Sequence, residues 1–432
     1  MMKPAAKNIG LIGAVAIGIG GMVGGGIFAV LGEAVSISHG ATPIAFLIAG
    51  IVALLTAVSY ARLSVTYQSR GGTAFFIDAA FGNNFLSGSL NLILWLSYLV
   101  TISLYAVAFA SYAGTFMHGH GSVLSNHLLI SAAILLPMLI NLLGASFVSK
   151  SETMIVALKI LLLIAIIIFS LPYINLQHVA PQHWGSVNAL VSAGMTIFVA
   201  YEGFELIANS AEEIADPERN LPRAFIISVV LVIALYIVIA TITVSTVPEA
   251  QLAAAKDFAL AVAARPALGQ TGFILVAIAA LLATFSAINA TIYGNARLGY
   301  LLAKDGQLPQ AFDKECWNKP VMGVLITSAI SLLIANSIDL SEIAILGSAG
   351  FLLVFSLVNV SAFKLRQKIG GYPWVYLSAF VMSTLSLGVL LVHTYHSDQR
   401  AVLTFAGFIV ISVLFELVYG RYVRSHFLGR GY

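Results

Sequence analysis

The sequence predicts an all-α polytopic membrane protein with twelve transmembrane helices. Of the 432 residues, 59% are hydrophobic and only 9% are charged, whereas a soluble domain carries roughly 25% charged residues. A globular protein this apolar could not cover its surface with polar groups, so we expect lipid around it. Its apolar residues form twelve long runs, and two of these runs are interrupted in the middle. The composition therefore indicates one membrane domain, residues 1–432, rather than several soluble domains.

The twelve apolar runs are each long enough to cross a bilayer, which takes about 20 helical residues. Several are longer than that, so we expect them to tilt or to extend beyond the lipid. They lie near residues 11–33, 42–68, 84–117, 123–144, 150–173, 187–211, 223–247, 271–304, 321–337, 341–364, 373–394 and 401–422.

Lysine and arginine residues indicate how the spans are oriented, because cytoplasmic loops are enriched in them. If the N-terminus with Lys3 and Lys7 is inside, 17 of the 21 Lys and Arg residues fall inside and three outside, with Lys159 within a span. The three outside residues are Lys256, Arg265 and Arg400. We therefore expect a multi-pass protein of the plasma membrane with both termini in the cytoplasm.

Two spans are interrupted, and they lie five spans apart. In the first span, six of the nine residues at 18–26 are glycine, which weakens helices. In the sixth, Glu202, Gly203 and Glu205 lie in mid-span. Paired interruptions of this kind are typical of transporters that are built from inverted repeats around a midplane binding site. We expect one repeat at about 9–173, the second at about 187–364, and extra helices at about 373–422.

An interrupted helix offers backbone groups to a ligand. Freed N–H and C=O groups are tolerated in a membrane only where they line a cavity or are buried in protein. The half-helix after the break begins with about half a positive charge and can bind a carboxylate, while carbonyls before the break can bind an ammonium. A molecule with both groups on one carbon is an α-amino acid. Alternatively, the glycines serve close helix packing, although Gly24, Gly25 and Gly26 are consecutive and cover every face.

Charged residues within the spans are further candidates for function. Lys159 lies in the fifth span, where a charge is costly enough to suggest a functional site, and desolvation favours its release of a proton. The alternative is a lysine that snorkels to the interface. Glu202 and Glu205 are three residues apart and could carry a proton or face a substrate ammonium. Either could instead accept a freed backbone N–H, which is the role that we favour for Glu205.

Other polar residues receive structural interpretations. Asn289 in the eighth span is expected to tie helices together, because a buried amide needs hydrogen-bond partners. His118, His120 and His127 have some likeness to a metal tract, but we expect a polar loop there. We predict no metal and no cofactor.

Four segments carry a family resemblance. They are GGGIF (24–28), SRGGTAFF (69–76), AYEGFELIANSAEEIADPERNLPRA (200–224) and SAINATIYGNARLGYLLAKDGQLP (286–309). These motifs resemble those of the amino acid–polyamine–organocation transporters, and the last is most similar to the archaeal ApcT-type proton-coupled amino acid transporters. The resemblance extends over essentially the whole chain. It implies the LeuT-type fold, with a 5+5 inverted repeat, broken helices 1 and 6, and two C-terminal helices.

The resemblance also implies roles for individual residues. The substrate carboxylate would meet the N–H groups of Gly25 and Gly26, next to Gly24. The ammonium would meet carbonyls near Met22, Val199 and Glu202. In the ApcT-type proteins a lysine that matches Lys159 takes the place of a sodium ion, and the matching neighbours are the Gly20 carbonyl and the Ser286 hydroxyl. Selectivity for the substrate side chain would depend on packing by Tyr98 and Tyr105 in the third span, Phe198 and Tyr201 in the sixth, and the tenth span. Glu202 departs from the ApcT-type pattern, which has an apolar residue there.

We therefore expect a secondary active transporter that imports L-amino acids, neutral ones over a broad range, by alternating access and with a proton. The alternative within this class is an obligate amino acid or amine exchanger. A channel is a remote alternative, because no repeated pore ring is present. An enzyme is not expected, since the sequence has no HExxH motif, no nucleophile elbow and no intramembrane His or Cys pair. The basic residues form no nucleic-acid-binding cluster, so the expected partners are the amino acid, the proton and the bilayer.

Overall fold

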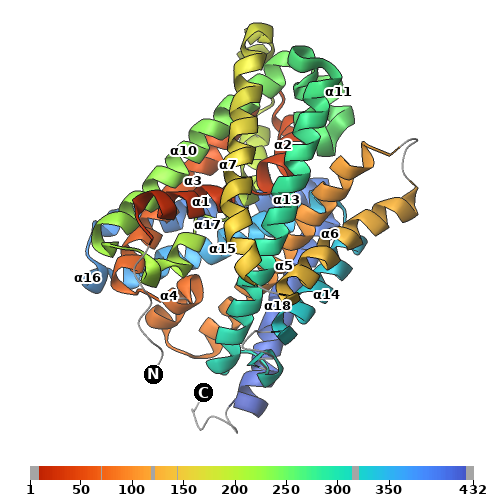
Figure 1. The fold of residues 1–432 in the computed structure, drawn as a ribbon. Coiled ribbons are helices and arrows are strands. Elements are labelled where there is room, and N and C mark those ends of the chain that lie inside the picture. Colours follow the sequence, from red (N-terminus) through yellow and green to blue (C-terminus); the bar gives the residue numbers. More distant parts are fainter. Residues whose placement is uncertain (1–8, 70, 118–121, 144, 314–320, 425–432) are drawn as a thin grey trace.

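The computed structural model describes residues 9–424 apart from 70, 118–121, 144 and 314–320 (Figure 1). Lys3, Lys7, His118 and His120 therefore lie outside the described residues. Within the described part, the protein consists of helices, with two isolated bridges and no β-strand. The all-α prediction is confirmed for these residues.

Nine helices of the described residues are long and apolar enough to cross a membrane. They are α3 (Thr42–Thr66), α5 (Phe85–Gly114), α6 (Val123–Leu143), α7 (Ala145–Ser170), α10 (Pro217–Thr246), α13 (Arg265–Lys304), α15 (Leu340–Lys364), α17 (Pro373–Ser397) and α18 (Gln399–Tyr419).

Two further spans are bent pairs of helices, at the two predicted interruptions. In the first, α1 (Leu11–Met22) and α2 (Gly26–Ser38) meet at 47°. In the second, α8 (Val187–Thr196) meets the segment Phe198–Asn209 at 48°. That segment contains the 3₁₀ turn η4 (Phe198–Tyr201) and the short helix α9 (Leu206–Asn209). The positions of both breaks are thus confirmed, and the chain is a multi-pass membrane protein.

One more apolar helix, α14 (Val321–Ser337), has 17 residues and matches the predicted ninth span. The predicted twelve spans would correspond to the nine long helices, the two bent pairs and α14. The count of twelve and the inverted repeat stay predictions. Shorter elements link the long helices: α4 (Gly72–Phe81), α11 (Glu249–Ala255), η6 (Lys256–Phe258), α12 (Ala259–Ala263) and α16 (Arg366–Ile369).

Two helices start earlier than the apolar runs predict. Helix α10 begins at Pro217 rather than near residue 223, because proline is favoured in a first helical turn and the polar turn that follows needs no lipid. Helix α13 begins at Arg265 and kinks at Gly269, whose φ is 61°. The predicted span near 271–304 is the straight part beyond that kink.

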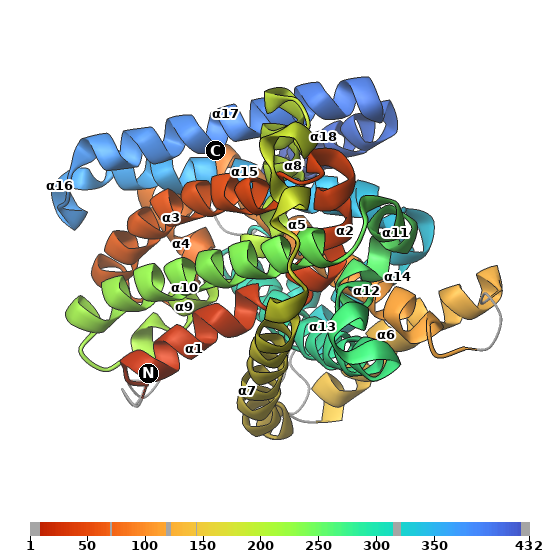
Figure 2. The ribbon, with the colours of Figure 1, turned by 90° about the horizontal axis from the view of Figure 1, so that it is seen from above.

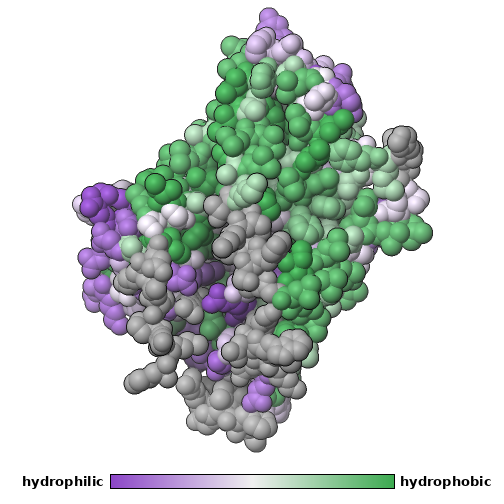
Figure 3. Space-filling model, in the orientation of Figure 1, coloured by the Kyte–Doolittle hydropathy of each residue, from purple (hydrophilic) through white to green (hydrophobic). Residues whose placement is uncertain are grey.

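The helices divide into a buried centre and a lipid-facing periphery. In the most apolar 18-residue stretch of each helix, 89% of the residues are buried in α5 and 83% in α15. The corresponding share is 22% in α6, α7 and α18. Viewed from above, α17 and α18 lie on one side and α7 on the opposite side (Figure 2). Hydrophobic residues cover the face formed by α13 and the upper part of α7 (Figure 3). This surface suits contact with lipid rather than water.

Helix α4 is fastened to the bundle by a buried polar cluster around Asp78. The Asp78 carboxylate accepts hydrogen bonds from the Asn91 amide at 3.0 Å and from the Gln307 amide at 3.1 and 3.0 Å. The Asn91 amide also donates to the Gln307 side-chain carbonyl at 2.7 Å. Asn91 belongs to α5, and Gln307 follows the end of α13. The cluster therefore joins α4, α5 and the segment after α13 through polar side chains, of which Asn91 and Gln307 are buried.

Replacing Asp78 with asparagine should remove a pH dependence from stability. Burial raises the pKa of Asp78 from 3.8 to about 6, against the opposing effect of the Gln307 hydrogen bond. The folded protein thus binds this proton more tightly than the unfolded chain, so stability should fall as pH rises from about 4 to about 6 and stay low above. The full effect corresponds to roughly 3 kcal/mol. Thermal unfolding in detergent between these pH values measures this pH dependence in the wild type and in Asp78→Asn. A pH profile of Asp78→Asn that equals that of the wild type would contradict the prediction.

Candidate functional site

The two helix breaks pack against each other, backbone to backbone. A Cβ added to Gly21 would come 2.5 Å from the Gly203 carbonyl oxygen, and one added to Gly203 would overlap the Gly21 carbonyl carbon. Gly203 has a φ of 120°, which side chains rarely adopt. A Cβ on Gly26 would come 2.7 Å from Cα of Ala200. Close packing, the alternative left open above, therefore does account for Gly21, Gly203 and Gly26.

The N-terminus of α2 carries no side-chain cap. Gly25 is its N-cap residue and, as a glycine, has no side chain that could cap the first turn. Gly24, Gly25 and Gly26 are all buried, and a Cβ on Gly24 would lie 3.0 Å from Cβ of Ala287. The first N–H groups of a helix attract anions. The start of α2 therefore has the features that attract a carboxylate at a helix N-terminus.

A tyrosine of α10 bridges the carbonyls of both breaks. The Tyr236 hydroxyl lies 2.7 Å from the Met22 carbonyl oxygen and 3.1 Å from that of Ala200. The carbonyl of Val199 accepts the N–H of Glu202 at 3.1 Å. Two of the carbonyls near which an ammonium was expected, those of Met22 and Val199, thus have internal donors here. Tyr236 is not among the residues predicted from the sequence, where its one signal is a phenol within a largely apolar run.

Phe198 and Tyr201 lie in an aromatic cluster next to the second break. The Phe198 ring packs 5.9 Å from the ring of Phe355 on α15. The Tyr201 hydroxyl donates to the Phe46 carbonyl on α3 at 2.8 Å, and its ring is 5.2 Å from that of Tyr236. These two side chains fix the second break between α3, α10 and α15.

The two acidic residues of the second break have different partners. Glu205 is fully buried; one carboxylate oxygen accepts the Gly203 N–H at 2.8 Å and the other accepts the Tyr98 hydroxyl at 3.1 Å. The predicted bond between Glu205 and a freed backbone N–H is thus present. The Glu202 carboxylate accepts the Tyr105 hydroxyl at 3.1 Å. Both phenols come from the central helix α5.

Lys159 reaches the first break from α7. Its ammonium donates to the Gly20 carbonyl at 3.1 Å, and the residue is only 2% exposed. The lysine therefore points into the bundle, and the snorkelling alternative was wrong. Ser286 is buried on α13, which packs against α7. This arrangement puts a buried cation on the broken first span.

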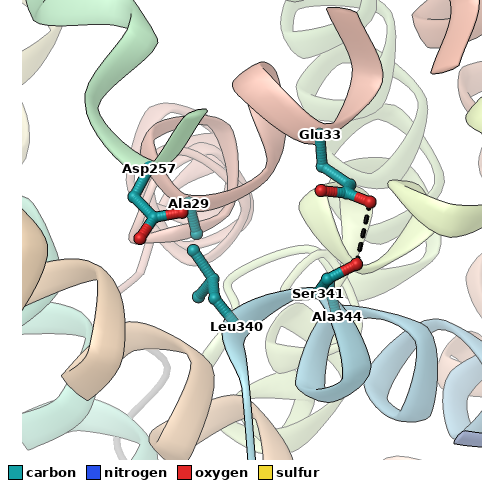
Figure 4. Close-up of a pocket in the computed structure, with 6 residues that line it drawn as sticks. All are labelled: Ala29, Glu33, Asp257, Leu340, Ser341 and Ala344. Carbon is teal, nitrogen blue, oxygen red and sulfur yellow. Dashed lines mark hydrogen bonds between the residues drawn. The ribbon is translucent and has the colours of Figure 1, made fainter. Parts of the chain in front are cut away.

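A small pocket lies away from the breaks, between α2, η6 and α15 (Figure 4). Its volume is only about 10 Å³, room for about one water molecule and far below the roughly 300–1,000 Å³ of typical ligand sites. Glu33 accepts the Ser341 hydroxyl at 2.8 Å on one side of it, and Asp257 on the other side accepts the Ser111 hydroxyl at 3.0 Å. These bonds tie the ends of four elements together.

The remaining polar predictions concern structure. The Asn141 amide of α6 donates to the Asn289 side chain of α13 at 2.8 Å, which confirms that Asn289 ties helices together. His127 pairs with Asn336 at 2.8 Å. Among the described residues, no group of three or more His, Cys, Asp or Glu side chains could hold a metal ion.

Known proteins resemble the chain over its full length. The model of the amino acid permease family matches residues 9–420. An uncharacterised protein of Methanocaldococcus jannaschii is 34% identical over 100% of this chain and 99% of its own. The inner membrane transport protein YbaT of Escherichia coli is 33% identical over 96% and 97%. The branched-chain amino acid permease BcaP of Bacillus subtilis is 25% identical over 98% and 94%.

These similarities cover both helix breaks, Lys159 and the spans that carry the four motifs. They identify a transporter of amino acid type rather than an enzyme. The chain belongs to the amino acid permease family of the amino acid–polyamine–organocation superfamily.

Proposed function

We propose that this protein imports L-amino acids across the cell membrane by alternating access, with a proton as the coupling ion. The observation that carries the proposal is the contact between the two broken spans. In the first of them, the half-helix α2 begins without a side-chain cap. The name of the branched-chain amino acid permease among its relatives supports an amino acid substrate. The distribution of Lys and Arg supports cytoplasmic termini.

In this proposal the substrate binds mainly to backbone. Its carboxylate meets the N–H groups of Gly25 and Gly26, where the partial charge of α2 favours an anion. Its ammonium meets carbonyls of Met22, Val199 and Glu202. Tyr236 contacts the Met22 carbonyl in this structure, so the ammonium shares or replaces that contact. Recognition through backbone suits a broad range of neutral side chains.

Lys159 is the proposed link between the proton and the first break. Its ammonium donates a hydrogen bond to the Gly20 carbonyl, two residues before Met22. In this proposal the Ser286 hydroxyl of α13 is its second neighbour. Release of a proton from Lys159 would weaken this contact and free the first break to move. Glu205, which holds the second break through Gly203, is the alternative proton carrier.

The decisive experiment is uptake of radiolabelled L-alanine into proteoliposomes. One series has an acid-outside pH gradient without sodium, and a second has a sodium gradient without a pH gradient. Both are run with and without amino acid trapped inside. Accumulation with the pH gradient alone supports proton symport. Uptake that requires trapped amino acid would replace the proposal with the obligate exchanger, and no uptake in any arm would refute alanine transport.

A further inference from the structure

The side chain of Tyr105 spans the space between the two helix breaks. A Cβ added to Gly25 would overlap the Tyr105 ring, so this ring packs directly against the glycine of the first break. At its other end, the hydroxyl donates to the Glu202 carboxylate in the second break at 3.1 Å. Tyr105 is 2% exposed and Glu202 is 4% exposed. We call this contact the Tyr105–Glu202 bridge.

The bridge fills a position that a ligand would need. A substrate bound at Gly25 has α5 beside it, and the α5 residue that touches Gly25 is Tyr105. A substrate with a short side chain can leave the ring largely in place. A longer side chain has to displace the ring, since protein interiors have little free space.

Displacement of Tyr105 has a consequence for Glu202. Within the part of the chain that the structure describes, the Tyr105 hydroxyl is the donor found for this carboxylate. The neighbouring Glu205 is already engaged by Gly203 and Tyr98. A buried acceptor that loses its donor is costly. A substrate that displaces Tyr105 therefore binds well only if it brings a donor of its own.

We propose that Glu202 determines selectivity among substrates with long side chains, an inference that rests on the proposed amino acid transport. In the absence of such a substrate, the Tyr105 hydroxyl occupies the position of the substrate's hydrogen-bond donor. Among amino acids long enough to displace Tyr105, the protein prefers those that end in a hydrogen-bond donor. A protonated amine is the strongest such donor, because a charge-assisted hydrogen bond exceeds a neutral one. Sites built to bond a polar group discriminate strongly against analogues that lack it.

Competition between matched amino acids tests this. L-Ornithine and L-norleucine have side chains of equal length, which end in an ammonium and a methyl group, and L-glutamine ends in a neutral amide. Each is used to inhibit L-alanine uptake into proteoliposomes preloaded with L-alanine, and each is also tested for thermal stabilisation of the detergent-solubilised protein. Wild type should favour ornithine and glutamine over norleucine by roughly 10- to 100-fold.

Substitutions distinguish a specific role of Glu202 from a general effect of mutation on substrate binding. Glu202→Leu should abolish the discrimination, and Glu202→Gln should lower the ornithine preference while glutamine still competes. Tyr105→Phe should strengthen ornithine binding several-fold, because the empty site loses the phenol that competes for Glu202. Tyr112→Phe is the matched control on the same helix, since its hydroxyl contacts only the Phe28 carbonyl among described partners, at 3.3 Å. It should keep the wild-type ratio.

The outcomes are distinct. Equal inhibition by ornithine and norleucine in wild type, or discrimination that survives in Glu202→Leu, overturns the role of Glu202 while alanine transport stands. If a Glu202 variant does not transport, thermal stabilisation still gives its ligand ratio. If none of the four amino acids is transported or stabilises the protein, the proposed function fails together with this inference.

Discussion

Replacing Gly26 with valine should abolish amino acid binding. A Cβ at this position would come 2.7 Å from Cα of Ala200, and that backbone atom cannot move aside without shifting the second break. The branched side chain would also crowd the first N–H groups of α2, where we place the carboxylate. A hydrogen bond to a charged group contributes about 1.5–3 kcal/mol, so the loss of one weakens binding roughly 10- to 150-fold. Loss of the bonds from both Gly25 and Gly26 should leave no measurable binding. Equilibrium binding of labelled L-alanine to Gly26→Val and to the wild type measures this loss of affinity.

The control for Gly26→Val is a valine at a glycine with free space. No atom lies within 4 Å of a Cβ built on Gly294, which is in α13. Gly294→Val should fold and bind alanine with near wild-type affinity. Size-exclusion profiles of both variants show whether Gly26→Val remains folded. Near-normal affinity in folded Gly26→Val would refute the proposed use of the α2 N-terminus.

Replacing Lys159 with alanine should abolish accumulation driven by a pH gradient. The substitution removes the ammonium that contacts the Gly20 carbonyl but leaves both breaks and the α2 N-terminus in place. Alanine binding should therefore be largely retained while transport is uncoupled. A difference of one pH unit supports at most about tenfold accumulation per proton, and in the variant this ratio should fall to about one. Uptake with and without an imposed gradient measures it.

Leu161 provides a matched control on the same helix. It is 63% exposed on α7, so Leu161→Ala changes only the surface that faces lipid. It should accumulate alanine as the wild type does. Accumulation at the wild-type level in Lys159→Ala would remove Lys159 from the coupling mechanism and turn attention to Glu205.

Local sequence was sufficient for the spans and their breaks. Apolar runs predict spanning helices because a lipid-facing helix needs about 20 apolar residues wherever its neighbours lie. Six glycines at 18–26 and the mid-span acids near 202–205 predict where helices are interrupted, and the bends of 47° and 48° occur there. Lys159 was identifiable for the same reason, since a charge within an apolar run is costly in any fold. The family followed from motifs that lie along the chain.

Only the tertiary structure decided what touches the breaks. The approach of Gly21 to Gly203, and of Gly26 to Ala200, joins segments about 180 residues apart. Tyr105 and Tyr236 come from two further helices, and nothing in their local sequence says that their hydroxyls meet the breaks. Hydropathy and spacing report the environment of a residue along one helix, whereas these contacts depend on how several helices pack. The sequence alone therefore determined the multi-pass membrane character, the positions of the two breaks and the family. Packing of the central helices decided which side chains lie between the breaks.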